Sequence, residues 1–221
     1  RHPAHHPHLE IQVNGRQRAV ALVSRRAGPD ILGTMKSPTA LTNHFLIAMP
    51  ALADPNFART VTLICDHSNE GTMGLVVNRP TDLKLRDILD QLGIDASGAL
   101  VADLPVYYGG PVQNHRGFVL HEPIGQWQAT LAVTDTLGVS SSRDILEAIA
   151  HNQGPARCLI ALGYAGWSPG QLERELSENA WLNGPADQAI LFDLPPESRW
   201  KAAAQRLGVD LSTFTGDAGH A

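Results

Sequence analysis

The feature of this chain that most restricts its fold is a succession of short apolar runs that begins after residue 40. The runs are only a few residues long and are bounded by Gly, Pro, Asp or Asn, which is the pattern of strands separated by turns. About eight strands are therefore expected, and they lie at residues 45–49, 61–65, 73–78, 106–108, 117–121, 127–133, 158–162 and 190–193.

Four amphipathic segments interrupt these runs and predict helices. Apolar residues spaced i, i+3, i+4 and i+7 from Leu85 to Leu92 stop at Gly93, a residue that commonly ends helices. A capping-box arrangement, with Ser168 as the cap and Gln171 three positions later, predicts a helix start at Ser168. The expected helices open at Leu85, after Ser141–Asp144, at Ser168 (running as far as Trp181) and at Pro196.

The order of these elements predicts the fold class. Strands and helices do not alternate strictly, so we expect a mixed sheet rather than a parallel one. The loop from Asp66 to Thr72 has the length of a hairpin connection, which favours antiparallel pairing of the strands on either side of it. At 221 residues and 43% hydrophobic content, the chain is expected to form one compact α/β (α+β) domain, a large mixed sheet flanked by about four helices.

The first 34 residues differ in composition from the rest. They hold four of the ten histidines, five basic residues and two acidic residues. We interpret 1–34 as a tag, a leader or a disordered tail, and 35–221 as the folded domain; the alternative is a basic arm for an acidic partner. Without this segment, twelve basic and twenty acidic residues remain, a formal charge of −8. Such an acidic body disfavours direct binding to DNA.

Several classes of protein do not fit the sequence. No apolar run approaches the ~18 residues of a membrane span, so no membrane association is expected. The two cysteines, Cys65 and Cys158, form no CxxC or Cys/His ligand spacing, which argues against a zinc site and favours the reducing cytoplasm. GxxxxGK[ST] and GxGxxG are also absent. We expect no metal and no cofactor.

Long strings of residues resemble the AlgH/YqgE family. The most extended are LTNHFLIAMP at 41–50, GTMGLVVNRP at 71–80 and GYAGWSPGQLE at 163–173, and the resemblance runs from about Leu41 to Ala221. It implies a compact bacterial cytosolic domain with a large mixed β-sheet and a link, through the family name, to regulation of alginate synthesis. It implies no defined biochemical activity.

Cys65 and His67 are the candidate catalytic residues. They stand two apart at the end of an expected strand, so their side chains should share a face, where the imidazole could lower the pKa of the thiol. Asn78 or Asn43 could then orient the imidazole. The alternative is that Cys65 is a packed core residue and that His67 begins a loop.

Two further groups are candidate binding or interaction residues. Asn78 and Arg79, ahead of Pro80, could bind an anion, and Gly109 with Gly110 would permit close approach of a ligand. The second group lies between a strand and a helix start and comprises Tyr164, Gly166, Trp167 and Gln171. We expect Asn78 and Arg79 to lie near it. The alternative for both groups is structural: turns, an internal ion pair and core aromatics.

Three classes of function remain, and the least favoured is a DNA-binding regulator, because the body is acidic. The first is a regulatory or protein-interaction role without enzymatic activity, acting on transcription indirectly. The second is a small-molecule-binding domain or a cysteine-based enzyme with a cleft around Cys65, His67 and Gly163–Gln171. Both leave open which protein or small molecule is the partner, and the oligomeric state.

Overall fold

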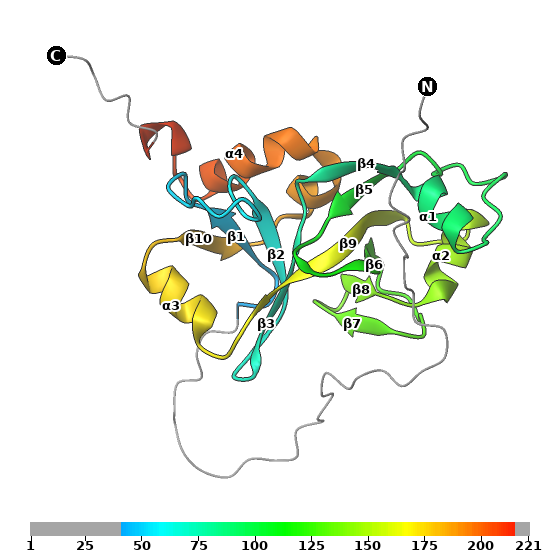
Figure 1. The fold of residues 1–221 in the computed structure, drawn as a ribbon, viewed down its shortest axis with the longest axis horizontal. Coiled ribbons are helices and arrows are strands. Elements are labelled where there is room, and N and C mark those ends of the chain that lie inside the picture. Colours follow the sequence, from blue (N-terminus) through cyan, green and yellow to red (C-terminus); the bar gives the residue numbers. More distant parts are fainter. Residues whose placement is uncertain (1–40, 215–221) are drawn as a thin grey trace, which may run out of the picture.

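The computed structural model describes residues 41–214, which form one domain built around a curled ten-stranded sheet (Figure 1). The strands are β1 (His44–Ala48), β2 (Val61–Ser68), β3 (Gly71–Val76), β4 (Pro80–Lys84), β5 (Pro105–Tyr108), β6 (Val112–Glu122), β7 (Thr130–Ala132), β8 (Gly138–Ser140), β9 (Arg157–Trp167) and β10 (Trp181–Pro185). The helices are α1 (Leu85–Gln91), α2 (Arg143–Ala150), α3 (Gln171–Ser177) and α4 (Pro196–Arg206), with a π-helical turn η1 (Ala189–Asp193) and a 3₁₀ turn η2 (Leu211–Phe214).

The long strand β9 lies at the centre of the sheet. The strand order is β10-β1-β2-β3-β9-β6-β8-β7, and β5 pairs with the first half of β9 while also carrying β4. The β5–β9 pairing is parallel and the other pairings are antiparallel, so the sheet is mixed, as the sequence predicts. One edge of β9 therefore pairs first with β5 and then, after Gly163, with β3.

Three apolar clusters fill the layers on the two faces of this sheet. The largest contains Leu63, Leu75 and Leu120 and is covered by η1 and α4. The second packs under α1 and α2, and the third under α3. Figure 1 shows α4 and α3 at one half of the sheet and α1 with α2 at the other. In β9, Leu159 and Ala161 join the first cluster while Ile160 and Leu162 join the second, because successive strand residues face opposite sides.

The structure confirms the fold class and the helices α1, α2 and α4. Three other expectations were wrong: a strand at 190–193, a helix start at Ser168, and the extension of that helix as far as Trp181. Residues 190–193 form the turn η1 rather than a strand, with Ile190 and Leu191 buried against the core. The third helix starts at Gln171 because Gly170 adopts a positive φ of 75° that ends the preceding turn, and it stops before Trp181, which opens β10. The segment 1–34 lies outside the described residues. Within them, no helix is both long and apolar enough to cross a membrane.

Candidate functional site

Cys65 and His67 lie on opposite faces of the sheet, contrary to the prediction. A β-bulge between Ile64 and Asp66 inserts one residue into β2 and reverses the alternation of side chains after it. Cys65 is buried in the first apolar cluster, and burial raises the pKa of its thiol to about 12. His67 faces α3, where Nδ1 lies 2.7 Å from Thr72 Oγ1 and Nε2 lies 3.3 Å from Glu173 Oε1. No thiol–imidazole pair forms.

The side chains of Asn78 and Arg79 hydrogen-bond to the backbone of the loop before β2 and to the first residue of β2. The Asn78 side chain accepts a hydrogen bond from Val61 N (2.8 Å) and donates one to Arg59 O (2.9 Å). The Arg79 guanidinium donates to three backbone carbonyls of the loop before β2, those of Pro55, Asn56 and Ala58, at 2.7–2.8 Å. These donors are therefore already engaged, and Arg79 bonds to carbonyls rather than to the carboxylate partner considered as the structural alternative.

Gly109 and Gly110 lie where the end of β5 crosses β9. A Cβ at Gly109 would stand 2.3 Å from Gly163 O, and one at Gly110 would stand 2.1 Å from Tyr164 C. Such contacts are sterically forbidden, so the two glycines let two backbones approach each other. This close approach accounts for both glycines by the crossing of the two strands.

In the segment from Tyr164 to Gln171, Ala165 and Trp167 belong to the core. Trp167 is 5% exposed and packs with Phe57 and Trp181 at ring-centroid distances of 6.0 Å. Glu175 accepts hydrogen bonds from both indoles, at 3.0 Å from Trp167 and 2.9 Å from Trp181, and from the Gln171 amide at 2.9 Å. Two buried indoles tied to one carboxylate and packed beside the half-buried Phe57 form a structural arrangement, in which Trp167 offers little exposed contact surface.

The remaining two members of this group, Tyr164 and Gly166, lie next to each other: a Cβ at Gly166 would stand 3.4 Å from Tyr164 Cε2. Tyr164 packs edge-on against Phe118 in the first apolar cluster, and of the four residues only Gly166 is exposed. Trp167 pairs with Thr72 at one end of β3, whereas Asn78 and Arg79 follow the other end of that strand. The predicted residues therefore do not form one site. Among residues 41–214, no three His, Cys, Asp or Glu side chains are grouped to hold a metal ion.

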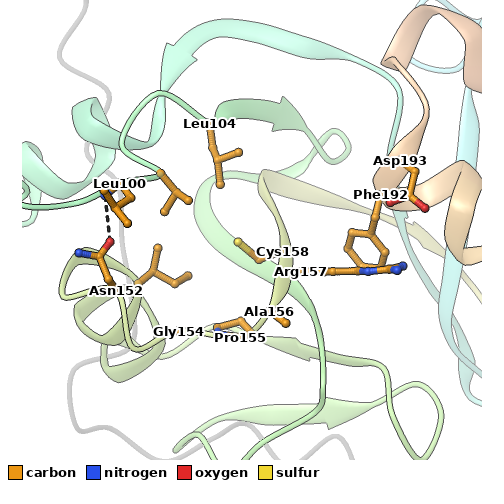
Figure 2. Close-up of a pocket in the computed structure, with 12 residues that line it drawn as sticks. Leu100, Leu104, Asn152, Gly154, Pro155, Ala156, Arg157, Cys158, Phe192 and Asp193 are labelled. Carbon is orange, nitrogen blue, oxygen red and sulfur yellow. Dashed lines mark hydrogen bonds between the residues drawn. The ribbon is translucent and has the colours of Figure 1, made fainter.

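An open pocket of about 400 Å³ lies elsewhere, between the end of α2, the start of β9, the turn η1 and the loop that follows α1 (Figure 2). We call it the Leu100 groove. Its walls combine apolar side chains with the polar groups of Asn152, Arg157 and Asp193; the apolar side chains are those of Leu100, Val101, Leu104, Ile149, Pro155, Cys158 and Phe192. Leu100 is 87% exposed and Val101 37% exposed; in the described part of the chain, Phe214 is the one other large apolar residue that is exposed.

The loop that carries Leu100 is fixed in place. Leu100 N donates a hydrogen bond to Asn152 Oδ1 (2.9 Å), and Asn152 Nδ2 donates to Gly98 O (2.8 Å). Asn152 itself adopts a positive φ of 60° just after α2, a conformation that asparagine tolerates better than most residues. On the other side, Arg86 N of α1 donates to Ala102 O (2.9 Å). An exposed leucine is thus presented by an ordered backbone.

Two charged residues line the Leu100 groove, and within the described range only one of them has a partner. The Arg157 guanidinium stacks over the Phe192 ring at 5.9 Å and lies 3.9 Å from Glu122 Oε2. Asp193 is exposed, and its carboxylate has no ion pair or hydrogen bond within residues 41–214. Burial raises the pKa of the Cys158 thiol to about 11, so this side chain contributes apolar surface rather than a thiolate.

A second open pocket, of about 460 Å³, lies between the end of α1 and α2. It is lined by polar groups that are already engaged: Arg143 Nε contacts Glu147 at 2.7 Å, and His151 Nδ1 lies 2.7 Å from Glu147 O. It lacks the apolar walls of the Leu100 groove.

None of the residues of the Leu100 groove was predicted as a site residue. Cys158 was expected to begin a strand, and Phe192 and Asp193 to lie in another. One signal was available: Leu100 and Val101 form an apolar pair between a predicted helix and a predicted strand, with no periodicity to bury them.

Comparison with known proteins gives consistent matches. A UPF0301 protein of Methylococcus capsulatus is 57% identical over 180 residues, which cover 81% of this chain and 96% of the relative. A UPF0301 protein of Thioalkalivibrio sulfidiphilus is also 57% identical, over 85% of this chain and 100% of the relative.

Two solved structures share the fold. The solution structure of the AlgH protein from Pseudomonas aeruginosa has 55% identity and a TM-score of 0.68, covering 86% of this chain and all of that chain. A crystal structure of a Corynebacterium diphtheriae protein, 20% identical, has a TM-score of 0.64 over 82% of this chain and 95% of its own. The AlgH-like family model, DUF179, matches residues 45–212, and the chain therefore belongs to the AlgH-like family.

Proposed function

We propose that this chain is a regulatory protein-interaction domain that binds a partner protein through the Leu100 groove. The observation that carries the proposal is Leu100 itself, 87% exposed beside an apolar pocket on a backbone fixed by Asn152. Exposing a large apolar side chain on an ordered loop is unfavourable in water, and apolar surface beside a pocket is typical of interaction sites.

The cysteine-enzyme alternative is not favoured, because Cys65 is buried with a raised pKa and His67 lies on the other face of the sheet. In the proposed role, the acidic body acts on transcription through its partner rather than by contact with DNA. Free thiols at Cys65 and Cys158 fit a reducing cytoplasm. The link to alginate synthesis rests on the family resemblance alone.

Selection from a displayed library of random peptides on the immobilised full-length chain tests the proposal. We expect enriched peptides that bind the wild type and lose at least tenfold in affinity for Leu100→Ser. Because Leu100 is exposed, this substitution should leave stability within about 0.5 kcal/mol of the wild type. The matched control is Phe214→Ser on η2, also an exposed apolar residue, which should bind normally. Equal binding by both variants, or no enrichment, would refute the proposal.

A further inference from the structure

We infer that the partner segment in the Leu100 groove carries an apolar anchor side chain followed closely by a basic side chain, lysine or arginine, that pairs with Asp193. This inference rests on the proposed function and adds the chemistry of the partner. It follows from how charge is distributed around the apolar walls.

The apolar anchor follows from the size and lining of the pocket. A volume of about 400 Å³ exceeds what a few ordered waters need and is at the scale of one or two large side chains with their backbone. Leu104, Ile149 and Cys158 line the pocket, and they would bury an aliphatic or aromatic side chain. Leu100 and Val101 would extend the apolar contact along the partner backbone.

The basic side chain follows from Asp193. Two charged residues belong to the lining. Arg157 already pairs with the carboxylate of Glu122, and its guanidinium stacks on the ring of Phe192. Asp193, the other charged residue of the lining, is exposed and has no such partner among the described residues. A lysine or arginine brought against it gains an ion pair, whereas an acidic side chain would meet repulsion from the carboxylate.

The net charge of the whole molecule also favours a basic partner segment. The sequence from residue 35 onward has a formal charge of −8, so a basic segment is attracted from a distance as well as at the site. Figure 2 shows Asp193 and Phe192 on one side of the groove and Leu100 with Asn152 on the other. A segment lying across the groove would therefore meet the apolar walls first and the carboxylate at one end.

The test uses the peptides enriched on the wild-type chain and measures their affinity by fluorescence anisotropy at low and at physiological salt. We expect lysine or arginine to be enriched within a few positions of an apolar residue. Asp193→Asn should weaken binding about three- to fivefold, the range of an exposed ion pair, and this loss should shrink as salt is raised. The matched control is Glu70→Gln at the distant β2–β3 turn, which should change nothing.

A charge exchange provides the second arm. Replacing the basic residue of a selected peptide by glutamate should weaken binding to the wild type, and Asp193→Lys should restore it. Peptides that depend on Leu100 but show no basic enrichment, or that bind Asp193→Asn unchanged, would overturn this inference and leave the proposed function standing. Peptides that bind independently of Leu100 would refute the proposed function itself.

Discussion

At the scale of single residues, His121 shows how the fold handles a buried titratable group. It is fully buried in β6, with Nε2 2.8 Å from Ser140 Oγ and Nδ1 3.1 Å from Pro123 O. Ser140 Oγ in turn lies 2.7 Å from Thr130 Oγ1. Burial lowers the pKa of His121 below its usual value of 6.5, which favours the neutral imidazole, and the contacts through Ser140 link β6, β8 and β7.

We predict that His121 makes stability depend on pH. A histidine with a lowered folded-state pKa contributes its full stability above the unfolded pKa of about 6.5, and this stability is lost as pH falls toward the folded pKa. Urea unfolding at pH 7.5 and 5.5 should show a fall for the wild type. His121→Gln should be about 1–3 kcal/mol less stable at pH 7.5, with a flatter pH dependence.

The matched control for this prediction is His151→Gln, because His151 is exposed at the end of α2. It should reproduce the pH dependence of the wild type. If His121→Gln keeps the same slope with pH, the titrating group lies elsewhere.

Single residues also show a limit of sequence reasoning. Cys65 and His67 share a face under strict alternation, and one extra residue in β2 separates them. A bulge depends on pairing with β3 and has no local signature here, so the sequence could not reveal it.

At the scale of elements, those with strong local signals were predictable. α1, α2 and α4 combine an apolar period with start or stop residues, and tertiary packing agrees with both. β8 has three residues, and β4 begins with Pro80 and exposes alternate polar side chains. Such elements exist because neighbouring strands pair with them, and this depends on contacts distant in sequence.

Arg79 gives a prediction for the loop between β1 and β2. Arg79→Ala removes three hydrogen bonds to loop carbonyls, two of them part-buried, and should cost about 2 kcal/mol in urea unfolding. It should also expose this loop to limited proteolysis. Arg79→Lys should recover only part of the loss, since an ammonium cannot match the planar fork.

The control for Arg79 is Arg86→Ala, which breaks an exposed ion pair with Asp103 and should cost less than 0.5 kcal/mol. Unchanged stability and proteolysis in Arg79→Ala would show that this guanidinium is free for an external anion, as the sequence first suggested.

At the scale of the whole molecule, the fold class was predictable and the Leu100 groove was not. The strand and helix pattern follows from residues close together in sequence, but the exposure of Leu100 depends on Asn152, 52 positions away. The segments that attracted most attention in the sequence, at 71–80 and 163–173, instead build the sheet and the aromatic cluster. The unusual residues of these segments are required by packing, as the glycines at the β5–β9 crossing are.

Net charge supports a prediction for the whole protein. The full-length chain should show no appreciable binding to duplex DNA at ~0.15 M salt, because a formal charge of −5 allows few phosphates to be neutralised. Anisotropy titration of labelled DNA measures this. Submicromolar, salt-sensitive binding would contradict the indirect role, and repeating the titration without residues 1–34 would assign it to the basic segment or to the acidic body.

The central position of β9 has a consequence for how this protein can be divided. Its first residues complete the sheet with β5 and β6, and its last residues complete the sheet with β3. A boundary placed anywhere along β9 would leave one half without its middle strand and expose unpaired backbone groups on both sides. The two halves are therefore not exchangeable modules: recombination between relatives, or a split-protein reporter, would have to keep this strand with both sets of neighbours.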